Sequence, residues 1–449
     1  MGKTGSRPAK SRARVLALGV VIALMASACG ADDSDDTSVS ESPTTTQVDS
    51  PEPTEASPAT TESMSLRDSL LERLPGEVHP LTEDIPDNLL QLLVDVRDQG
   101  PGELVWVDAG GEVHEGWSEA FLDDWEAITG WSVIESAPGL DLSTAAVQAQ
   151  VDSGATEWDV FAILDYGTAE RLALEGYWEP IDYSLFDVAA LPDVAFYSDE
   201  EGNLVRGGSG GAIPSQGYYV GASDFGIVLQ YNTDVFAEGS QPDSTLDFFD
   251  VEQFPGKRCA FNFAQFGGNL EFAAMANGAT WDEVYDVLAT EEGLQAAFDR
   301  LDDIYDEIVW ANSGADSIQF LLDGQCDLGI TFNGRPALRI KQEPGLPVTI
   351  TWGGSIVNGG PFAIPKGAPN YDAALSVYAL SMLPSRQCAA LNAIGYGVVM
   401  NADPFPGCLD DFGSEWGPQY GAAAGLADPF FFSDRPEVEE AWAEWQSGH

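Results

Sequence analysis

The amino-acid sequence predicts an α/β fold built from two α/β units. Apolar residues make up 44 % of the 449 residues and aromatic residues 10 %, as is usual for a chain that buries a core. Taking about 150 residues as one domain gives two or three structural units. From residue 102 onward, short apolar runs alternate with runs of helical periodicity, which is typical of parallel sheets covered by helices.

The first unit is predicted from the order β-α-β-α-β. Strands are expected at residues 104–107, 131–134 and 158–164. A helix between the first two strands carries its apolar residues on one face and ends at Gly130, and a second helix includes residues 147–151. Before this unit, residues 66–96 show helical spacing interrupted by prolines, which predicts two short helices packed on the main body.

The second unit is predicted from a similar alternation. The expected strands are 225–231, 258–261, 326–331 and 348–352, and the expected helices are 294–304 and 372–382. Asn370 is a plausible cap for the last helix, which Pro384 stops.

The charge balance excludes one class of partner. The chain holds 19 Lys and Arg against 73 Asp and Glu, a net charge of −54. Because five basic residues and no acid precede residue 29, a chain beginning there carries −59. Such a surface repels phosphates, so we expect no nucleic-acid partner. Salt adaptation or solubility explains the acids more simply than a role in ligand choice.

The N-terminal segment predicts export. Residues 1–28 join a basic head to an apolar run of 14 residues, too short to span a bilayer, and read as a signal peptide. The stretch Met25-Ala26-Ser27-Ala28-Cys29-Gly30 resembles the lipobox of bacterial lipoproteins, which implies cleavage before Cys29 and lipidation of its thiol. An ordinary cleavage site with an incidental cysteine is the alternative. The protein would then be extracytoplasmic and anchored to the cell membrane.

A disordered tether is predicted for residues 29–63. This segment is rich in Ser, Thr, Pro and acidic residues and cannot bury enough surface to offset chain entropy. Its r.m.s. reach is roughly 30 Å or more by the square-root rule for flexible chains.

Four segments resemble, in order, the extracellular solute-binding proteins of ABC importers, specifically the spermidine/putrescine-binding-like group. They are Trp158-Asp159-Val160-Phe161, residues 248–258 (FFDVEQFPGKR), residues 321–335 (LLDGQCDLGITFNGR) and residues 362–370 (FAIPKGAPN). The resemblance implies a two-lobed, type II periplasmic-binding-protein-like clamshell, each lobe a mainly parallel sheet flanked by helices. It also implies a ligand held in the cleft between the lobes and delivered to ABC permease subunits.

The implied lobe boundaries follow from this resemblance. Lobe 1 is expected to comprise residues 102–232 and 333–385, and lobe 2 residues 233–332 and 386–449. The first crossing would follow residues 225–232, and the second would lie near 332–335.

Four cysteines remain in the folded part, an even number that favours disulfides in an exported chain. Of the three possible pairings we favour Cys259 with Cys326 and Cys388 with Cys408. The second loop is short, and the first bond would join two strands of one lobe if the implied fold holds.

Candidate ligand-binding residues lie beyond the carboxyl ends of the predicted strands, where open α/β sheets bind ligands. They are Gly110, Gly111, Asp165, Tyr166, Gln265, Phe266, Trp310, Asn312, Ser313, Phe332 and Arg335, with Asp108 beside the first pair. Tyr166 and Trp310 could flank an alkylammonium group, and Asp165 could pair with it. Core packing for the aromatic residues and a turn or helix cap for Asp165 are the alternatives.

The sequence departs from true polyamine binders at two positions of this expected site. The loop 264–268 and the segment 332–335 supply no carboxylate, whereas Arg335 offers a planar fork suited to a ligand carboxylate. Arg335 could equally pair with a surface acid. A zwitterionic or carboxylated amine therefore fits at least as well as putrescine or spermidine.

Enzyme chemistry finds little support. Residues 207–211 match the G-x-S-x-G pattern, but a polar turn precedes them and the only later histidine is His449. The histidines His79 and His114 do not form a metal site. Glu112 and His114 are expected on the same side of a strand, but a third ligand is lacking. We expect a monomeric substrate-binding lipoprotein with no enzyme activity, metal or cofactor, and keep a secreted surface hydrolase as the alternative.

Overall fold

The structure is a computed structural model that describes residues 64–136, 140–162, 165–186, 195–198, 204–207, 216–219, 221–397, 415–417, 424–428 and 431–449. The predicted signal peptide, Cys29, the tether and Cys408 lie outside these residues. In the described part of the chain, no helix has the length and apolar character needed to cross a membrane.

A three-stranded parallel sheet forms the centre of the first lobe. Its order is β2-β1-β3, with β1 (Glu103–Val107) between β2 (Ser132–Ser136) and β3 (Val160–Phe161). The predicted β-α-β-α-β order is therefore confirmed. The surrounding helices are α4 (Asp123–Thr129), α5 (Leu140–Ser153), α6 (Tyr166–Leu174), α12 (Tyr371–Ser381) and α13 (Pro384–Ile394).

The helix that follows β1 is longer than predicted and changes its winding. It runs through α3 (Glu112–Trp117), the π-helical turn η2 (Ser118–Leu122) and α4, and it buries the predicted apolar face. Gly130 ends it in the left-handed conformation at φ 73°, as expected. The expectation of a strand around Glu112 and His114 is wrong, because both residues lie in the first turn of α3.

The N-terminal extension packs on this lobe, but it holds three helical segments where two short helices were predicted. It consists of α1 (Leu66–Leu71), the 3-10 helix η1 (Gly76–Thr82) and α2 (Asp87–Asp98). The apolar residues Leu89, Leu90, Leu93 and Val94 are fully buried in the first core. Asn370 precedes α12, but its side chain does not cap that helix; it donates to the Glu103 carbonyl and to Asp159 Oδ2 instead.

A six-stranded mixed sheet forms the second lobe, in the order β10-β9-β11-β8-β12-β13. The strands are β8 (Gly221–Asn232), β9 (Arg258–Phe261), β10 (Ile308–Ala311), β11 (Leu328–Phe332), β12 (Val348–Pro361) and β13 (Ala424–Leu426). Among these described strands, only β8 runs antiparallel to its neighbours, β11 and β12.

Helices of the second lobe cover this sheet. They are η4 (Thr245–Phe249), α7 (Asn269–Ala276), α8 (Val284–Leu288), α9 (Glu291–Asp302), η5 (Tyr305–Glu307), α10 (Gly314–Leu322), α11 (Gly334–Gln342), α15 (Phe431–Asp434) and α16 (Pro436–Gly448). Smaller elements complete the fold: β4 (Ile181–Asp182), η3 (Tyr183–Leu185), β5 (Ala195–Ser198), β6 (Leu204–Gly207) and β7 (Gln216–Gly217).

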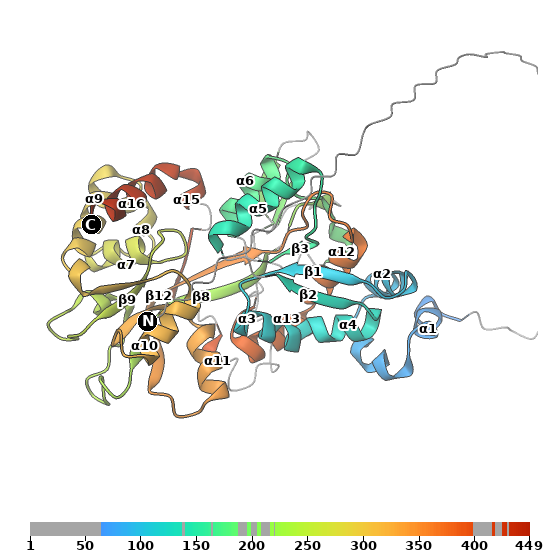
Figure 1. Cartoon of the computed structure of the whole chain (residues 1–449), viewed down its shortest axis with the longest axis horizontal. Helices are drawn as coiled ribbons and strands as arrows, with labels where there is room; N and C mark the ends of the chain where they lie inside the picture. Colours follow the sequence, from blue (N-terminus) through green and yellow to red (C-terminus); the bar gives the residue numbers. More distant parts are fainter. Residues whose placement is uncertain are drawn as a thin grey trace, which may run out of the picture. The chain divides into compact units, whose positions relative to one another are not determined.

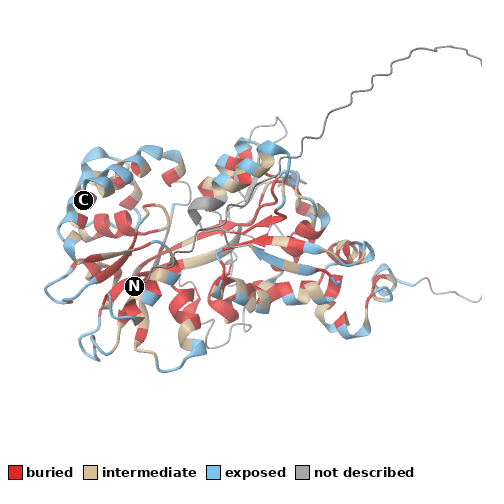
Figure 2. Ribbon diagram, viewed as in Figure 1, coloured by how far each residue is buried: buried red, intermediate tan, exposed pale blue. Residues whose placement is uncertain are grey.

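Each sheet has its own hydrophobic core, and buried residues concentrate on the strands and inner helix faces (Figure 2). The helix α13, which the sequence placed in lobe 2 from residue 386, packs in the first core beside α3. Gly116 on α3 lies so close to Ile394 on α13 that a Cβ there would be 2.7 Å from Ile394 Cβ. The strand β12, expected in lobe 1, belongs to the six-stranded sheet. Both differences have the same cause: α13 buries its apolar face in the first core, and β12 pairs within the sheet of the second lobe.

The two lobes are connected by the long antiparallel strands β8 and β12 (Figure 1). Pro361 at the end of β12 pairs with Gly221 at the start of β8, and Ala363 then bridges to Phe161 of the first sheet. The first crossing therefore runs along β8 rather than following it. Asn333 fixes the junction, because its side chain accepts from Gly226 N at 2.7 Å and donates to the Gly395 carbonyl at 2.9 Å.

The structure contains the disulfide Cys259–Cys326, which ties β9 to the segment preceding β11. Cys388 lies in the first core on α13 and not in the second lobe, where it was expected. With Cys408 outside the described residues, the pairing of Cys388 with Cys408 stays a prediction.

Candidate functional site

Four aromatic side chains meet where the lobes join: Phe225, Phe266, Phe332 and Tyr396, here called the hinge aromatic cluster. The Phe225 ring lies 5.1 Å from Phe332, 5.7 Å from Phe266 and 5.9 Å from Tyr396 between centroids. Phe225 and Phe332 contact both hydrophobic cores. The cluster thus brings together two predicted site residues, Phe266 and Phe332, around the crossing strand β8.

Phe266 holds an unusual backbone conformation. Its φ of 63° makes it the one non-glycine residue with positive φ among those the structure describes. A left-handed conformation is costly for a bulky residue, and such strain is concentrated at ligand-binding sites. Phe266 lies in the loop between β9 and α7, so this loop is a candidate for direct ligand contact.

Arg335, on α11 three residues after Phe332, is buried with 6 % of its surface exposed. Its guanidinium donates to Glu112 Oε2 on α3 at 2.7 Å, an ion pair that joins the two lobes. Arg335 Nε is buried and has no partner among the described residues. Arg335 therefore pairs with an acid of the protein, which was the alternative considered for it. Its Nε–H group remains available to a ligand.

Acidic groups gather at the other end of the aromatic cluster. Gln265, next to Phe266, hydrogen-bonds Asp165 through its side chain and donates its backbone N–H to Glu439 Oε1 at 3.0 Å. Burial raises the pKa of Asp165, and burial likewise raises the pKa of Glu439, with the charge of Asp165 adding to that shift. Asp165 belongs to lobe 1 and Gln265 to lobe 2, so their contact also crosses between the lobes, whereas Glu439 on α16 lies in the same lobe as Gln265.

Glu271 on α7 adds a further buried carboxyl group to this side. Burial raises its pKa to about 7, and the nearby charge of Glu439 contributes in the same direction. Tyr285 donates a long hydrogen bond of 3.4 Å to Glu271 Oε1, while Oε2 has no partner within the described ranges. This side of the lobe junction therefore favours positive charge.

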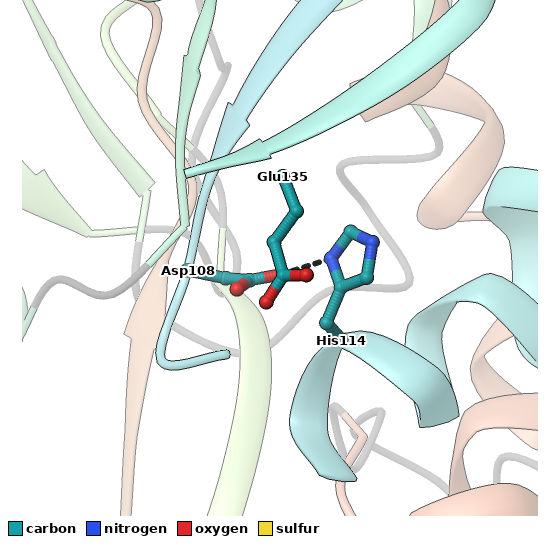
Figure 3. A group of neighbouring side chains, drawn as sticks. All are labelled: Asp108, His114 and Glu135. Carbon is teal, nitrogen blue, oxygen red and sulfur yellow. Dashed lines mark hydrogen bonds and ion pairs between the residues drawn. The ribbon is translucent and has the colours of Figure 1, made fainter. Parts of the chain in front are cut away.

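A second group of side chains lies at the carboxyl end of β1. Asp108 is fully buried, its Oδ1 accepts from Gly110 N at 2.8 Å, and its Oδ2 accepts from His114 Nδ1 at 2.7 Å. Glu135 on β2 approaches the same point (Figure 3). Hydrogen bonding to Asp108 is the main cause that raises the pKa of His114.

The remaining predicted residues hold mostly local positions. Gly110 and Gly111 form the turn into α3 with φ values of 66° and 56°. Asp165 caps α6 by accepting from Thr168 N at 2.7 Å, and Tyr166 is buried at the start of that helix.

Three predicted residues lie around the end of β10. Trp310 packs against Tyr305, Trp442 and Trp445 of the second lobe. Ser313 caps α10, and Asn312 is exposed. Within the described residues, Trp310 forms no ring pair with a member of the hinge aromatic cluster.

Sequence reasoning missed the partners of the predicted residues. Glu112, Glu271 and Glu439 are ordinary acids in a chain with 73 of them, and no local signal separates them from exposed ones. His114 was considered, but Asp108 and Glu135 could be recognised as its neighbours only once β1 and β2 were known to be adjacent.

Most of the chain is similar to known proteins. The family of bacterial extracellular solute-binding proteins matches residues 120–403. The γ-aminobutyric acid-binding protein of Pseudomonas aeruginosa is 29 % identical over 298 residues, covering 66 % of this chain and 76 % of that protein.

Solved structures agree with that match. The structure of the Atu4243–GABA receptor is similar with a TM-score of 0.61 and 26 % identity, covering 77 % of this chain and 98 % of its own. An ABC transporter substrate-binding protein from Bradyrhizobium japonicum USDA 110 is similar with a TM-score of 0.63 and 27 % identity, covering 77 % of this chain and 99 % of its own. The predicted resemblance to solute-binding proteins of ABC importers and the type II fold are both confirmed.

Proposed function

The chain belongs to the bacterial extracellular solute-binding protein family, and we propose that its solute is a small zwitterionic amine of the γ-aminobutyric acid type. It is a substrate-binding protein of an ABC importer, acts outside the cytoplasm and delivers its solute to a permease without transforming it. The hydrolase alternative finds no support among its relatives.

The observation that carries the proposed solute class is the buried Arg335 beside the hinge aromatic cluster, with buried carboxyl groups at the cluster's other end. A guanidinium recognises a carboxylate through parallel hydrogen bonds, and Arg335 keeps an unused Nε donor. Asp165 and Glu439 would receive the ammonium group, with Phe266 able to offer its ring face to that cation. A diamine would place a second cation near Arg335, which is unfavourable.

The same residues link binding to closure of the lobes. The Arg335–Glu112 pair and the contact of Gln265 with Asp165 each join groups of different lobes. A solute that touches both ends of the aromatic cluster binds the closed arrangement better than an open one, and this differential affinity shifts the population toward closure. The closed form is then the one presented to the permease.

Membrane attachment extends the proposal. Cleavage before Cys29 and lipidation of its thiol would anchor the chain, and residues 30–63 would let the folded part turn close to the membrane. We expect a monomer. Mass spectrometry of the membrane fraction would detect a lipidated N-terminal Cys29, and a soluble product cleaved elsewhere would contradict the anchor.

Calorimetric titration of the chain with γ-aminobutyrate, butyrate, n-butylamine and putrescine tests the solute class. We expect one molecule of γ-aminobutyrate per chain, recovered unchanged. Butyrate and n-butylamine each lack one charged group and should bind at least about tenfold more weakly, since a hydrogen bond to a charged group contributes about 1.5–3 kcal/mol.

Putrescine is the decisive comparison. Tighter binding of putrescine than of γ-aminobutyrate would overturn the assignment of Arg335 to a ligand carboxylate and restore the polyamine alternative. Binding of none of the four compounds would reject the proposed solute class.

A further inference from the structure

We propose that Asp108, His114 and Glu135 form a binding site for a divalent transition-metal ion such as Zn²⁺. One ligand atom from each residue lies within 4.8 Å of the others. Asp108 follows β1, His114 lies in the first turn of α3, and Glu135 lies on β2, so three different elements converge on one point (Figure 3). The proposal does not rest on the identity of the proposed solute.

The neighbouring strands fix two of the three groups. Glu135 is in parallel register with Trp106, and Asp108 N donates to the Ser136 carbonyl at 3.1 Å, so both carboxylates leave the same edge of the sheet. The Gly110 N–H bond to Asp108 Oδ1 orients this carboxylate from outside the site, as the outer hydrogen-bond partners of metal ligands do. Oδ2 is the oxygen that faces His114.

The charge at this point favours a cation. Asp108 and Glu135 bring two carboxylates together, and the charge of Asp123 also acts on His114. In the part of the chain that the structure describes, no Lys or Arg forms an ion pair with Asp108 or Glu135. His114 is the one ion-pair partner of Asp108 among the described residues, and a divalent ion would neutralise both carboxylates.

The donor set indicates which ion fits. An imidazole nitrogen with two carboxylates suits Zn²⁺ and similar ions, whereas Mg²⁺ and Ca²⁺ prefer oxygen ligands alone. Three protein ligands leave a coordination position open for water or another small ligand. To chelate, His114 Nδ1 and Asp108 Oδ2 would exchange their hydrogen bond for bonds to the ion.

Equilibrium dialysis of the metal-free full chain against Zn²⁺ alone, at about 0.5 M NaCl, tests the site. The salt screens weak binding to the acidic surface. We expect one tightly bound ion per chain, at least about 100-fold weaker binding in His114→Gln and at least about 10-fold weaker binding in Glu135→Gln. Glu135 is exposed, so this second variant should fold even if the first does not.

His79→Gln is the matched control, because His79 contacts the Leu71 carbonyl away from these three residues and should leave zinc binding unchanged. Co²⁺ gives a second readout, a ligand-field absorption spectrum that Glu135→Gln should alter. Zinc binding that is unchanged in both His114→Gln and Glu135→Gln would overturn the proposal. So would zinc affinity in the wild type no higher than that of Ca²⁺.

Discussion

Replacing the buried Glu271 by glutamine should make the stability of the protein less dependent on pH. Glu271 is 4 % exposed, and burial raises its pKa to about 7 from an ordinary value of 4.5. Between these two values the folded protein holds a proton on Glu271 that the unfolded chain has released. This contribution to stability is complete below pH 4.5 and is lost as the pH rises through 7.

The size of the effect follows from the two pKa values. A shift from 4.5 to about 7 corresponds to about 3 kcal/mol, at about 1.36 kcal/mol per pKa unit. The wild type therefore loses about 3 kcal/mol between about pH 4.5 and pH 8 through this group. A glutamine side chain cannot ionise, so the Glu271→Gln variant should gain about 3 kcal/mol relative to the wild type over the same interval.

Urea unfolding followed by tryptophan fluorescence at about pH 4.5 and pH 8 measures this difference. The exposed Glu292→Gln is the matched control and should show no pH-dependent gain over the wild type. If the free energies of unfolding of Glu271→Gln and the wild type differ equally at both pH values, Glu271 is ionised in the folded protein and the reasoning from burial is wrong.

Three further predictions concern binding and stability. Arg335→Gln should weaken γ-aminobutyrate binding about 10- to 150-fold more than it weakens n-butylamine binding in the same titration, because loss of the Glu112 ion pair affects both ligands and only γ-aminobutyrate also loses a charge-assisted contact of about 1.5–3 kcal/mol; equal losses for both would argue against a carboxylate contact. Replacing both Cys259 and Cys326 by Ala opens a loop with a sequence separation of 67 and should lower the unfolding free energy by about 4 kcal/mol in denaturant titrations, a value that a loss below about 1 kcal/mol would contradict. Arg258→Met should cost about 3 to 5 kcal/mol because the fully buried guanidinium donates to the carbonyls of Phe248, Asp250, Phe254 and Gly256, and a thermal transition unchanged from wild type would refute that role.

The secondary structure followed closely from local patterns. The parallel strands of the first sheet and the helix ending at Gly130 were predictable, because alternation, periodicity and a left-handed glycine are properties of short segments. The same reasoning placed a strand around His114, since a four-residue pattern cannot separate a strand from the first turn of a helix.

The lobe boundaries required more than a family pattern. The sequence order of motifs predicted two lobes, but it did not indicate that β12 would join the six-stranded sheet or that α13 would pack beside α3. Which core an amphipathic segment joins depends on the shape of the surfaces available to it, and these form only when the sheets assemble.

Local sequence was sufficient to predict the two α/β units and the candidate loops at the strand ends. It also identified Arg335 as a candidate ligand-binding residue. The partners of these residues came from the fold: Glu112 meets Arg335 across 223 residues, Gln265 meets Glu439 across 174, and Glu135 reaches Asp108 through strand pairing. Hydrophobic periodicity acts over a few residues, whereas the pairing of charges depends on distance in space. For a chain with 73 acids, only folding selects which of them lie together.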